Sequence, residues 1–167
     1  MIDAYFDNYE PIANFHRRGN RMARERMCVL YDKSAKYKGL VAGTGNKSEL
    51  MTGYVTQYGD GACAFEPLGH LYKTEVYRLA ELMRIPSELI DKKPTADLWA
   101  NQTDEEELGI SYEVLDELLY RLYELKQTKE TIIRAGYLEK DIVRVKELYN
   151  RSEFKRHLPP QLKVITI

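Results

Sequence analysis

The sequence predicts an α/β protein that is mostly helical and carries one buried parallel strand of a larger sheet. Residues 40–43, Leu-Val-Ala-Gly, form a short apolar run between Gly39 and a Gly-Thr-Gly turn, which is typical of a strand buried on both faces. Most other apolar residues recur at helical spacing. The remaining β-prone segment is the tail at residues 163–167. Because a parallel strand needs neighbours, we expect a partner chain or a longer α/β protein to supply them.

The first half of the chain is expected to hold an extended entry and two helices around this strand. Residues 1–18 mix aromatic residues with Pro11 and show no sustained period, which indicates an extended segment with at most a short helical turn. Asn20 is expected to cap a helix that Gly39 stops. A second helix should begin after the strand, within residues 44–59. The first helix carries one apolar face: Met22, Met27, Leu30 and Tyr31.

The middle of the chain pairs a helix with a long polar segment. A helix is expected after His70, with Pro86 ending it. Residues 92–109 are rich in charged and polar side chains and are too long for a simple connector, so we expect a binding loop. The helix has one apolar side: Val76, Leu79, Ala80, Leu82 and Met83.

The final third is predicted to be helical. Ser111 caps one helix, Thr128 opens the next and Gly136 closes it. A last amphipathic helix is expected, which Pro159 and Pro160 should break. Its apolar residues are Ile142, Val145, Leu148 and Tyr149.

Size and charge restrict the class of protein. A chain of 167 residues fits a single domain spanning 1–167. With 25 basic and 26 acidic residues, it has no overall field to attract nucleic acid or an anionic membrane. No apolar run approaches the roughly 18 residues that a membrane span needs, and the N-terminus is unlike a signal peptide. We expect a cytoplasmic protein without nucleic-acid or membrane partners, with Cys28 and Cys63 as free thiols.

The Gly-Thr-Gly turn lies where ligands bind in open α/β sheets. Residues 43–49, Gly-Thr-Gly-Asn-Lys-Ser-Glu, join the carboxyl end of the strand to a helix start, and small residues there let backbone amides approach an anion. Two glycines alone, however, more often make an ordinary tight turn. Glu49 is likewise explained by the helix dipole before any magnesium is invoked.

Charged and aromatic groups have ordinary explanations when each is taken alone. The basic run at residues 16–26 is more often a solvated helix face than a phosphate contact. Residues 104–107, Asp-Glu-Glu-Glu, are typical of a solvated loop or helix start. The histidines lack metal-ligand spacing, and Trp99 is more often a core or interface residue than a base-stacking platform.

Taken together, six segments in order resemble the ammonia-dependent NAD synthetase family. They are Asn-Arg-Met-Ala-Arg-Glu-Arg-Met (20–27), the turn at 43–49, Thr-Gly-Tyr-Val-Thr-Gln-Tyr-Gly-Asp-Gly-Ala (52–62), Gly-His-Leu-Tyr-Lys-Thr-Glu-Val (69–76), the block 92–116 containing Pro-Thr-Ala-Asp-Leu-Trp-Ala-Asn-Gln-Thr, and Phe-Lys-Arg-His-Leu-Pro-Pro (154–160). Several ordered motifs are far more specific than one. The resemblance implies an adenine-nucleotide alpha hydrolase-like, Rossmann-like fold, with helices on both sides of a parallel sheet.

The resemblance also implies roles for individual residues, none of them a catalytic nucleophile. ATP would contact Thr44, Lys73 and Thr95, and Mg²⁺ would contact Glu49. Deamido-NAD would contact Gln57 and Lys155, and Arg24 would reach the deamido-NAD of a partner subunit. A two-fold homodimer is therefore expected.

The sequence departs from the family pattern at three places. It contains no Ser-Gly-Gly-x-Asp-Ser loop, which in the family cradles pyrophosphate and supplies a second magnesium carboxylate upstream of the equivalent of residue 1. We therefore expect a chain truncated by its first strands that makes little or no NAD alone. Ala64 stands where some members carry an Asp that contacts deamido-NAD, and Phe154 where some carry His.

The implied reaction amidates a carboxylate in two steps. The nicotinate carboxylate of deamido-NAD attacks the α-phosphorus of ATP, giving an adenylate and pyrophosphate, and ammonia then displaces AMP to leave NAD. Catalysis of this kind is mostly positioning and charge neutralisation. No glutaminase portion is identified, so ammonia would come from solution or from another polypeptide.

Two alternatives stay open. A different ATP pyrophosphatase that amidates another carboxylate would share the Gly-Thr-Gly turn but should lack the block at residues 94–109. A non-catalytic dimerising or binding remnant, using the basic helix on RNA, would show salt-sensitive RNA binding.

Overall fold

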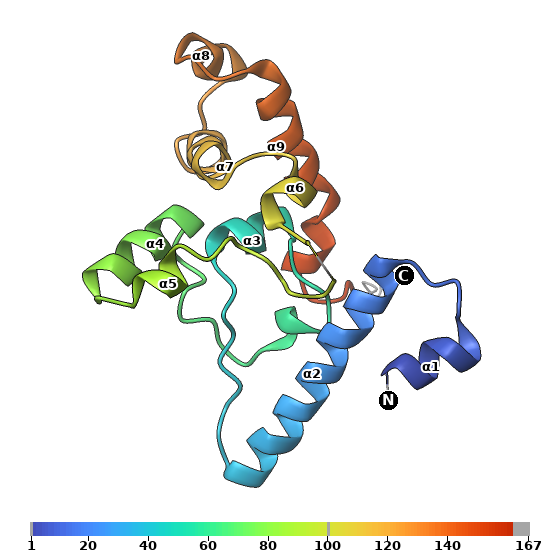
Figure 1. The fold of residues 1–167 in the computed structure, drawn as a ribbon. Helices are drawn as coiled ribbons and strands as arrows, with labels where there is room; N and C mark the ends of the chain where they lie inside the picture. The colour runs from blue at the N-terminus through green and yellow to red at the C-terminus, as the bar shows by residue number, and fades with distance from the viewer. Residues whose placement is uncertain (1, 100, 162–167) are drawn as a thin grey trace, which may run out of the picture.

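The computed structural model describes residues 2–99 and 101–161, which are mostly helical (Figure 1). The predicted tail strand at residues 163–167 lies outside the described residues. Within them the α-helices are α1 (Ile2–Tyr9), α2 (Phe15–Tyr37), α3 (Lys47–Thr52), α4 (Lys73–Leu82), α5 (Ser87–Ile90), α6 (Asp104–Leu108), α7 (Tyr112–Leu119), α8 (Lys129–Arg134) and α9 (Glu139–Arg151). Short turns η1 (Asp60–Ala62) and η3 (Glu153–Arg156) are 3-10 helices, and η2 (Tyr120–Glu124) is a π-helical continuation of α7.

The N-terminal segment is helical rather than extended, and the long helix begins earlier than predicted. Residues 2–9 form α1, and Asn14, not Asn20, caps α2 by accepting a hydrogen bond from the Arg17 backbone N–H at 3.0 Å. Ile2, Tyr5, Phe6 and Tyr9 recur at helical spacing, a short signal that the prediction of an extended segment missed. The Arg18 guanidinium lies 4.6 Å from the Phe6 ring centroid and joins α1 to α2. Asn20 lies inside α2 and accepts a hydrogen bond from the Thr56 hydroxyl at 2.7 Å.

The end of α2 lies where the sequence places it, but a different residue makes the stop. Lys38, not Gly39, adopts the left-handed conformation, with φ 52° and ψ 39°. The Gly39 backbone N–H donates to the Ser34 carbonyl at 3.0 Å and closes the last turn.

The predicted parallel strand is reduced to one bridge in the part of the chain that the structure describes. Ala42 pairs with Phe65 in parallel orientation, with the Gly43 N–H donating to the Phe65 carbonyl at 2.8 Å and the Ala64 N–H to the Val41 carbonyl at 2.9 Å. The expected parallel sheet is thus not shown. Residues 40–43 are not buried on both faces either, because only Val41 is buried and Leu40 is exposed.

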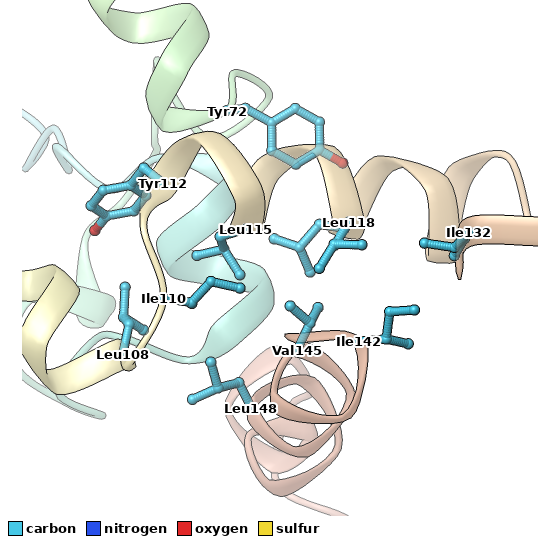
Figure 2. Packing of buried hydrophobic residues seen from close by; sticks show 11 residues of the cluster. Tyr72, Leu108, Ile110, Tyr112, Leu115, Leu118, Ile132, Ile142, Val145 and Leu148 are labelled. Atoms are coloured by element: carbon cyan, nitrogen blue, oxygen red, sulfur yellow. The ribbon is translucent and has the colours of Figure 1, made fainter. Parts of the chain in front are cut away.

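The hydrophobic core lies at the other end of the chain, where α7 packs on α9. Figure 2 shows Leu115 and Leu118 of α7 pointing toward Ile142 and Val145 of α9. Further residues of α7 and α9, together with residues of α6, α8 and the loops, complete the cluster: Tyr72, Leu108, Ile110, Tyr112, Leu119, Ile132 and Leu148. This core is the support on which α3 and α4 rest.

Most of the predicted helix boundaries in the second half are confirmed. Thr128 accepts a hydrogen bond from the Thr131 N–H, and Gly136 follows α8 with φ 98°. Ser111 stands at the start of α7, although its side chain makes no capping bond. The segment at residues 92–109, expected to be a binding loop, is a loop up to Thr103, and residues 104–108 form α6.

Helices α4 and α9 end several residues ahead of the prolines that were expected to end them. Helix α4 ends before Pro86, but Leu82 and Met83, expected on its apolar side, are exposed. Helix α9 ends at Arg151, well ahead of the prolines, and the chain continues into η3.

Candidate functional site

A cleft of about 1080 Å³ lies between α2, α3, the start of α4 and the segment at residues 92–102. Five of the seven residues that the resemblance singles out line this cleft: Thr44, Glu49, Lys73, Thr95 and Lys155. They come from segments far apart in the sequence, so the fold brings them together.

Glu49 and Lys73 form an ion pair in the cleft wall. The Lys73 Nζ lies 3.2 Å from the Glu49 Oε1, and their side chains are only 19% and 16% exposed. Burial raises the pKa of Glu49, and the positive charge of Lys73 opposes this shift. Without Lys73, the buried Glu49 carboxylate would keep its desolvation cost and lose its nearest positive charge.

Helix capping fixes where Glu49 lies. Asn46 accepts a hydrogen bond from the Glu49 backbone N–H at 3.1 Å, and the Glu49 Oε2 accepts one from the Asn46 backbone N–H at 3.0 Å. This reciprocal pair is a capping box. The sequence analysis explained Glu49 by the helix dipole, and the capping box is a further structural role that it did not predict. The capping bond uses Oε2 and leaves Oε1 facing Lys73.

Packing requires a glycine at position 43 of the turn, whereas at Gly45 the flexible end of the Glu66 side chain could move aside. A Cβ on Gly43 would lie 2.4 Å from the Cys63 sulfur, and one on Gly45 would lie 2.9 Å from a carboxylate oxygen of Glu66.

Burial raises the pKa of Cys63 to about 11, so its thiol is a poor nucleophile at neutral pH. The two cysteines are free, as predicted.

A second acidic group in the cleft was missed by sequence reasoning. Asp104 is only 4% exposed and accepts hydrogen bonds from the hydroxyls of Tyr54 and Tyr112, each at 3.2 Å. The Tyr54 hydroxyl also lies 3.2 Å from Glu107. Burial raises the pKa of Asp104, opposed first by Lys73. The expectation that residues 104–107 are all solvated is thus wrong for Asp104. The sequence of an acidic run does not show which of its carboxylates is buried.

Lys155 connects the C-terminal segment to the rim of the cleft. Its Nζ donates to the carbonyls of Gly53 at 2.7 Å and Val55 at 2.6 Å. Burial lowers the pKa of Lys155, and the charge of Asp60 opposes that shift.

Arg24 and Gln57 lie outside the group of cleft residues. The Arg24 Nε donates to the Gln57 carbonyl at 3.1 Å, which joins α2 to the segment before η1. Thr95, in the cleft, accepts a hydrogen bond from the Asp97 N–H at 3.1 Å. Phe154 is exposed, and the Ala64 backbone N–H donates a hydrogen bond to the Val41 carbonyl at 2.9 Å.

The basic run at residues 16–26 is largely engaged within the chain. Arg17 pairs with Glu10 at 3.1 Å, Arg18 with Asp3 at 3.5 Å and Arg21 with Glu25 at 3.3 Å. The run is therefore not simply a solvated face. These pairs leave less free positive charge for RNA than the sequence alone indicates.

Within the described residues, no group of three or more His, Cys, Asp or Glu side chains is arranged to hold a metal ion. Glu49 is one carboxylate, and Mg²⁺ is commonly bound through one or two carboxylates together with substrate phosphates and water. Glu49 could therefore bind Mg²⁺ only together with substrate phosphates and water. Across residues 2–99 and 101–161, no helix is long and apolar enough to cross a membrane.

The sequence profile of the family described as NAD synthase matches residues 1–159. The chain belongs to the NAD synthase family. Curated relatives include the NH3-dependent NAD+ synthetase of Trichlorobacter lovleyi, 52% identical over 164 residues, and that of Fusobacterium nucleatum, 50% identical over 165 residues. The matches cover 98% of this chain but 60% and 63% of those proteins. The chain thus spans about three fifths of the NAD synthetases that it matches.

Solved structures of the family superpose on the chain. An NMN synthetase from Francisella tularensis has a TM-score of 0.82 at 34% identity, covering 96% of this chain and 62% of that one. The NH3-dependent NAD synthetase from Campylobacter jejuni, in complex with nitrate, has a TM-score of 0.78 at 36% identity, covering 97% and 62%. These likenesses agree with a Rossmann-like family fold.

Proposed function

We propose that this chain forms the part of an ammonia-dependent NAD synthetase that holds ATP and deamido-NAD during amidation of the nicotinate carboxylate. The observation that carries the proposal is the convergence of Thr44, Glu49, Lys73 and Thr95 on one cleft. Family membership supports the same substrates.

Charge neutralisation is the main task of such a site, because ATP brings several negative charges. Among the cations that line the cleft, Lys73 is the one proposed to contact the phosphates, and the hydroxyls of Thr44 and Thr95 would hold the nucleotide. Glu49 would hold Mg²⁺, which when bound neutralises phosphate charge. In this scheme the protein orients the nicotinate carboxylate toward the α-phosphorus, and ammonia displaces AMP from the adenylate.

The deamido-NAD contacts are proposed for Gln57 and Lys155, with Arg24 reaching the deamido-NAD of a second copy. A homodimer of this kind is supported by apolar side chains that α2 leaves exposed, such as Val29, Leu30 and Tyr37. Size-exclusion chromatography with light scattering tests it. A dimer that dissociates in a Leu30→Glu variant agrees with the proposal, and a wild-type monomer at high concentration contradicts it.

Substrate binding tests the proposed function directly. We would titrate the chain calorimetrically with deamido-NAD, with and without ATP and Mg²⁺, and measure NAD formation in parallel. Saturable binding that tightens with ATP is expected. Absence of binding to both ligands, with no NAD formed, would overturn the proposal.

The NMN synthetase likeness supports a second candidate substrate, nicotinate mononucleotide. It carries the same reacting carboxylate as deamido-NAD and lacks the adenylyl half. Titration with both acids separates the two candidates. Tighter binding of deamido-NAD favours the NAD synthetase assignment, and tighter binding of the mononucleotide favours the alternative.

A further inference from the structure

Asp116 is a buried carboxylate whose only partners among the described residues are uncharged donors. It lies on α7 next to the core residue Leu115 and is 4% exposed. Its Oδ1 accepts a hydrogen bond from the Ser48 hydroxyl, and its Oδ2 accepts one from the Thr74 backbone N–H at 2.9 Å. Placing a carboxylate in this position is costly, so its hydrogen bonds need an explanation beyond ordinary packing.

Both partners of Asp116 are sequence neighbours of the cleft ion pair. Ser48 precedes Glu49 at the start of α3, and Thr74 follows Lys73 at the start of α4. The Ser48 Oγ also accepts a hydrogen bond from the Lys73 backbone N–H at 2.9 Å. Asp116 and Ser48 thus join the starts of both helices to α7 at the point from which Glu49 and Lys73 approach each other.

The direction of each hydrogen bond is fixed by chemistry. A backbone N–H can only donate, so the Ser48 oxygen is an acceptor toward Lys73, and its own proton must point to Asp116. Both oxygens of Asp116 therefore face donors. An ionised carboxylate accepts from both donors. An amide keeps only one acceptor oxygen, and its NH2 group can donate to the Ser48 oxygen only if the Ser48 hydroxyl proton turns away from residue 116, so the present hydrogen bond from Ser48 is lost. The negative charge is also favoured near the N-terminal end of α4.

We propose that Asp116 is a positioning residue: through Ser48 and Thr74 it fixes the starts of α3 and α4, and so holds Glu49 and Lys73 at the separation that the ATP site needs. This rests on the proposed function, since the need for that separation comes from ATP. Asp116 itself does not line the cleft.

The test compares Asp116→Asn with two matched controls. Glu117→Gln removes one negative charge from the neighbouring position of α7, where the side chain pairs with Arg121 at 2.7 Å. Ile142→Val removes a core methyl group from α9, away from the cleft, and serves as a control for lost stability. Trp99 is the single tryptophan and lines the cleft, so its fluorescence reports binding of ATP with Mg²⁺.

We expect Asp116→Asn to raise the Kd for ATP at least five-fold at a temperature where every variant is folded. The Kd for ATP of Glu117→Gln and of Ile142→Val should stay within two-fold of the wild type. This should hold even if Ile142→Val lowers the melting temperature as much as Asp116→Asn does. Ser48→Ala should resemble Asp116→Asn, because it breaks the same connection. A Kd for Asp116→Asn within two-fold of the wild type overturns the proposal.

Amide hydrogen exchange separates this proposal from the proposed function. If the wild type binds no ATP, the proposed function fails, and exchange at the Lys73 and Thr74 amides still decides whether Asp116 positions α4. Faster exchange at both amides in Asp116→Asn, but not in Ile142→Val, supports the positioning role. Unchanged exchange overturns it.

Discussion

Lys73→Met is the substitution that most sharply tests the ATP role of the cleft. Methionine keeps most of the side-chain length and removes the charge that faces Glu49 at 3.2 Å. A hydrogen bond to a charged group contributes about 1.5–3 kcal/mol, and about 1.4 kcal/mol corresponds to a tenfold change in affinity. We therefore expect ATP to bind about 10- to 100-fold more weakly.

The assay is titration with ATP and Mg²⁺, followed by Trp99 fluorescence. Lys47→Met is the matched control: Lys47 begins α3, pairs with Glu124 at 2.5 Å and does not line the cleft. Its Kd should stay within two-fold of the wild type. Equal affinities for wild type and Lys73→Met, or equal losses in both lysine variants, would refute the reasoning.

Three further outcomes are expected. Burial raises the folded-state pKa of Glu49 above its ordinary value, so the folded protein binds this proton at a higher pH than the unfolded chain does. The wild type should therefore gain stability relative to Glu49→Gln as the pH falls from neutral toward the unfolded-state pKa of about 4.5. Melting temperatures of both proteins at several pH values check this, and a difference that does not change with pH would contradict it. Gly53→Ala should cost about 2–4 kcal/mol by chemical denaturation, because φ is +66° and the new Cβ would lie 2.2 Å from the Ser152 Cβ; a loss below about 1 kcal/mol would count against the packing described. Leu115→Ala should cost about 2–5 kcal/mol in the same assay, because the side chain is fully buried, and a near-neutral effect would show that the α7–α9 core is wrongly placed.

Helical periodicity predicts the second half of the fold better than the first. The α7–α9 core follows from apolar spacing, and Thr128 and Gly136 mark real helix ends. The start of α2 was missed because Asn14 and Asn20 are both residues of capping type, and only the hydrogen bond from the Arg17 backbone N–H shows that Asn14 is the cap. The strand neighbour was missed because its pairing is a single bridge at Phe65.

The candidate site was predictable only in part, and mainly from the ordered motifs. The sequence alone explains Glu49 by the helix dipole, and the resemblance implies Mg²⁺ for Glu49 and ATP for Lys73. Only the structure shows that the two side chains form an ion pair. Burial of Asp104 and Asp116 had no signal in the sequence, because both lie among other acidic residues whose side chains are more exposed. Their importance comes from tertiary hydrogen bonds made to Tyr54, Tyr112, Ser48 and Thr74.

The most direct test of the central claim is amide hydrogen exchange of the chain with and without ATP and Mg²⁺. The account predicts that ATP protects residues 43–49, 73–75 and 92–96 together, because these three segments line one cleft. Protection confined to α2 or to the α8–α9 surface, or no protection at millimolar ATP, would contradict it.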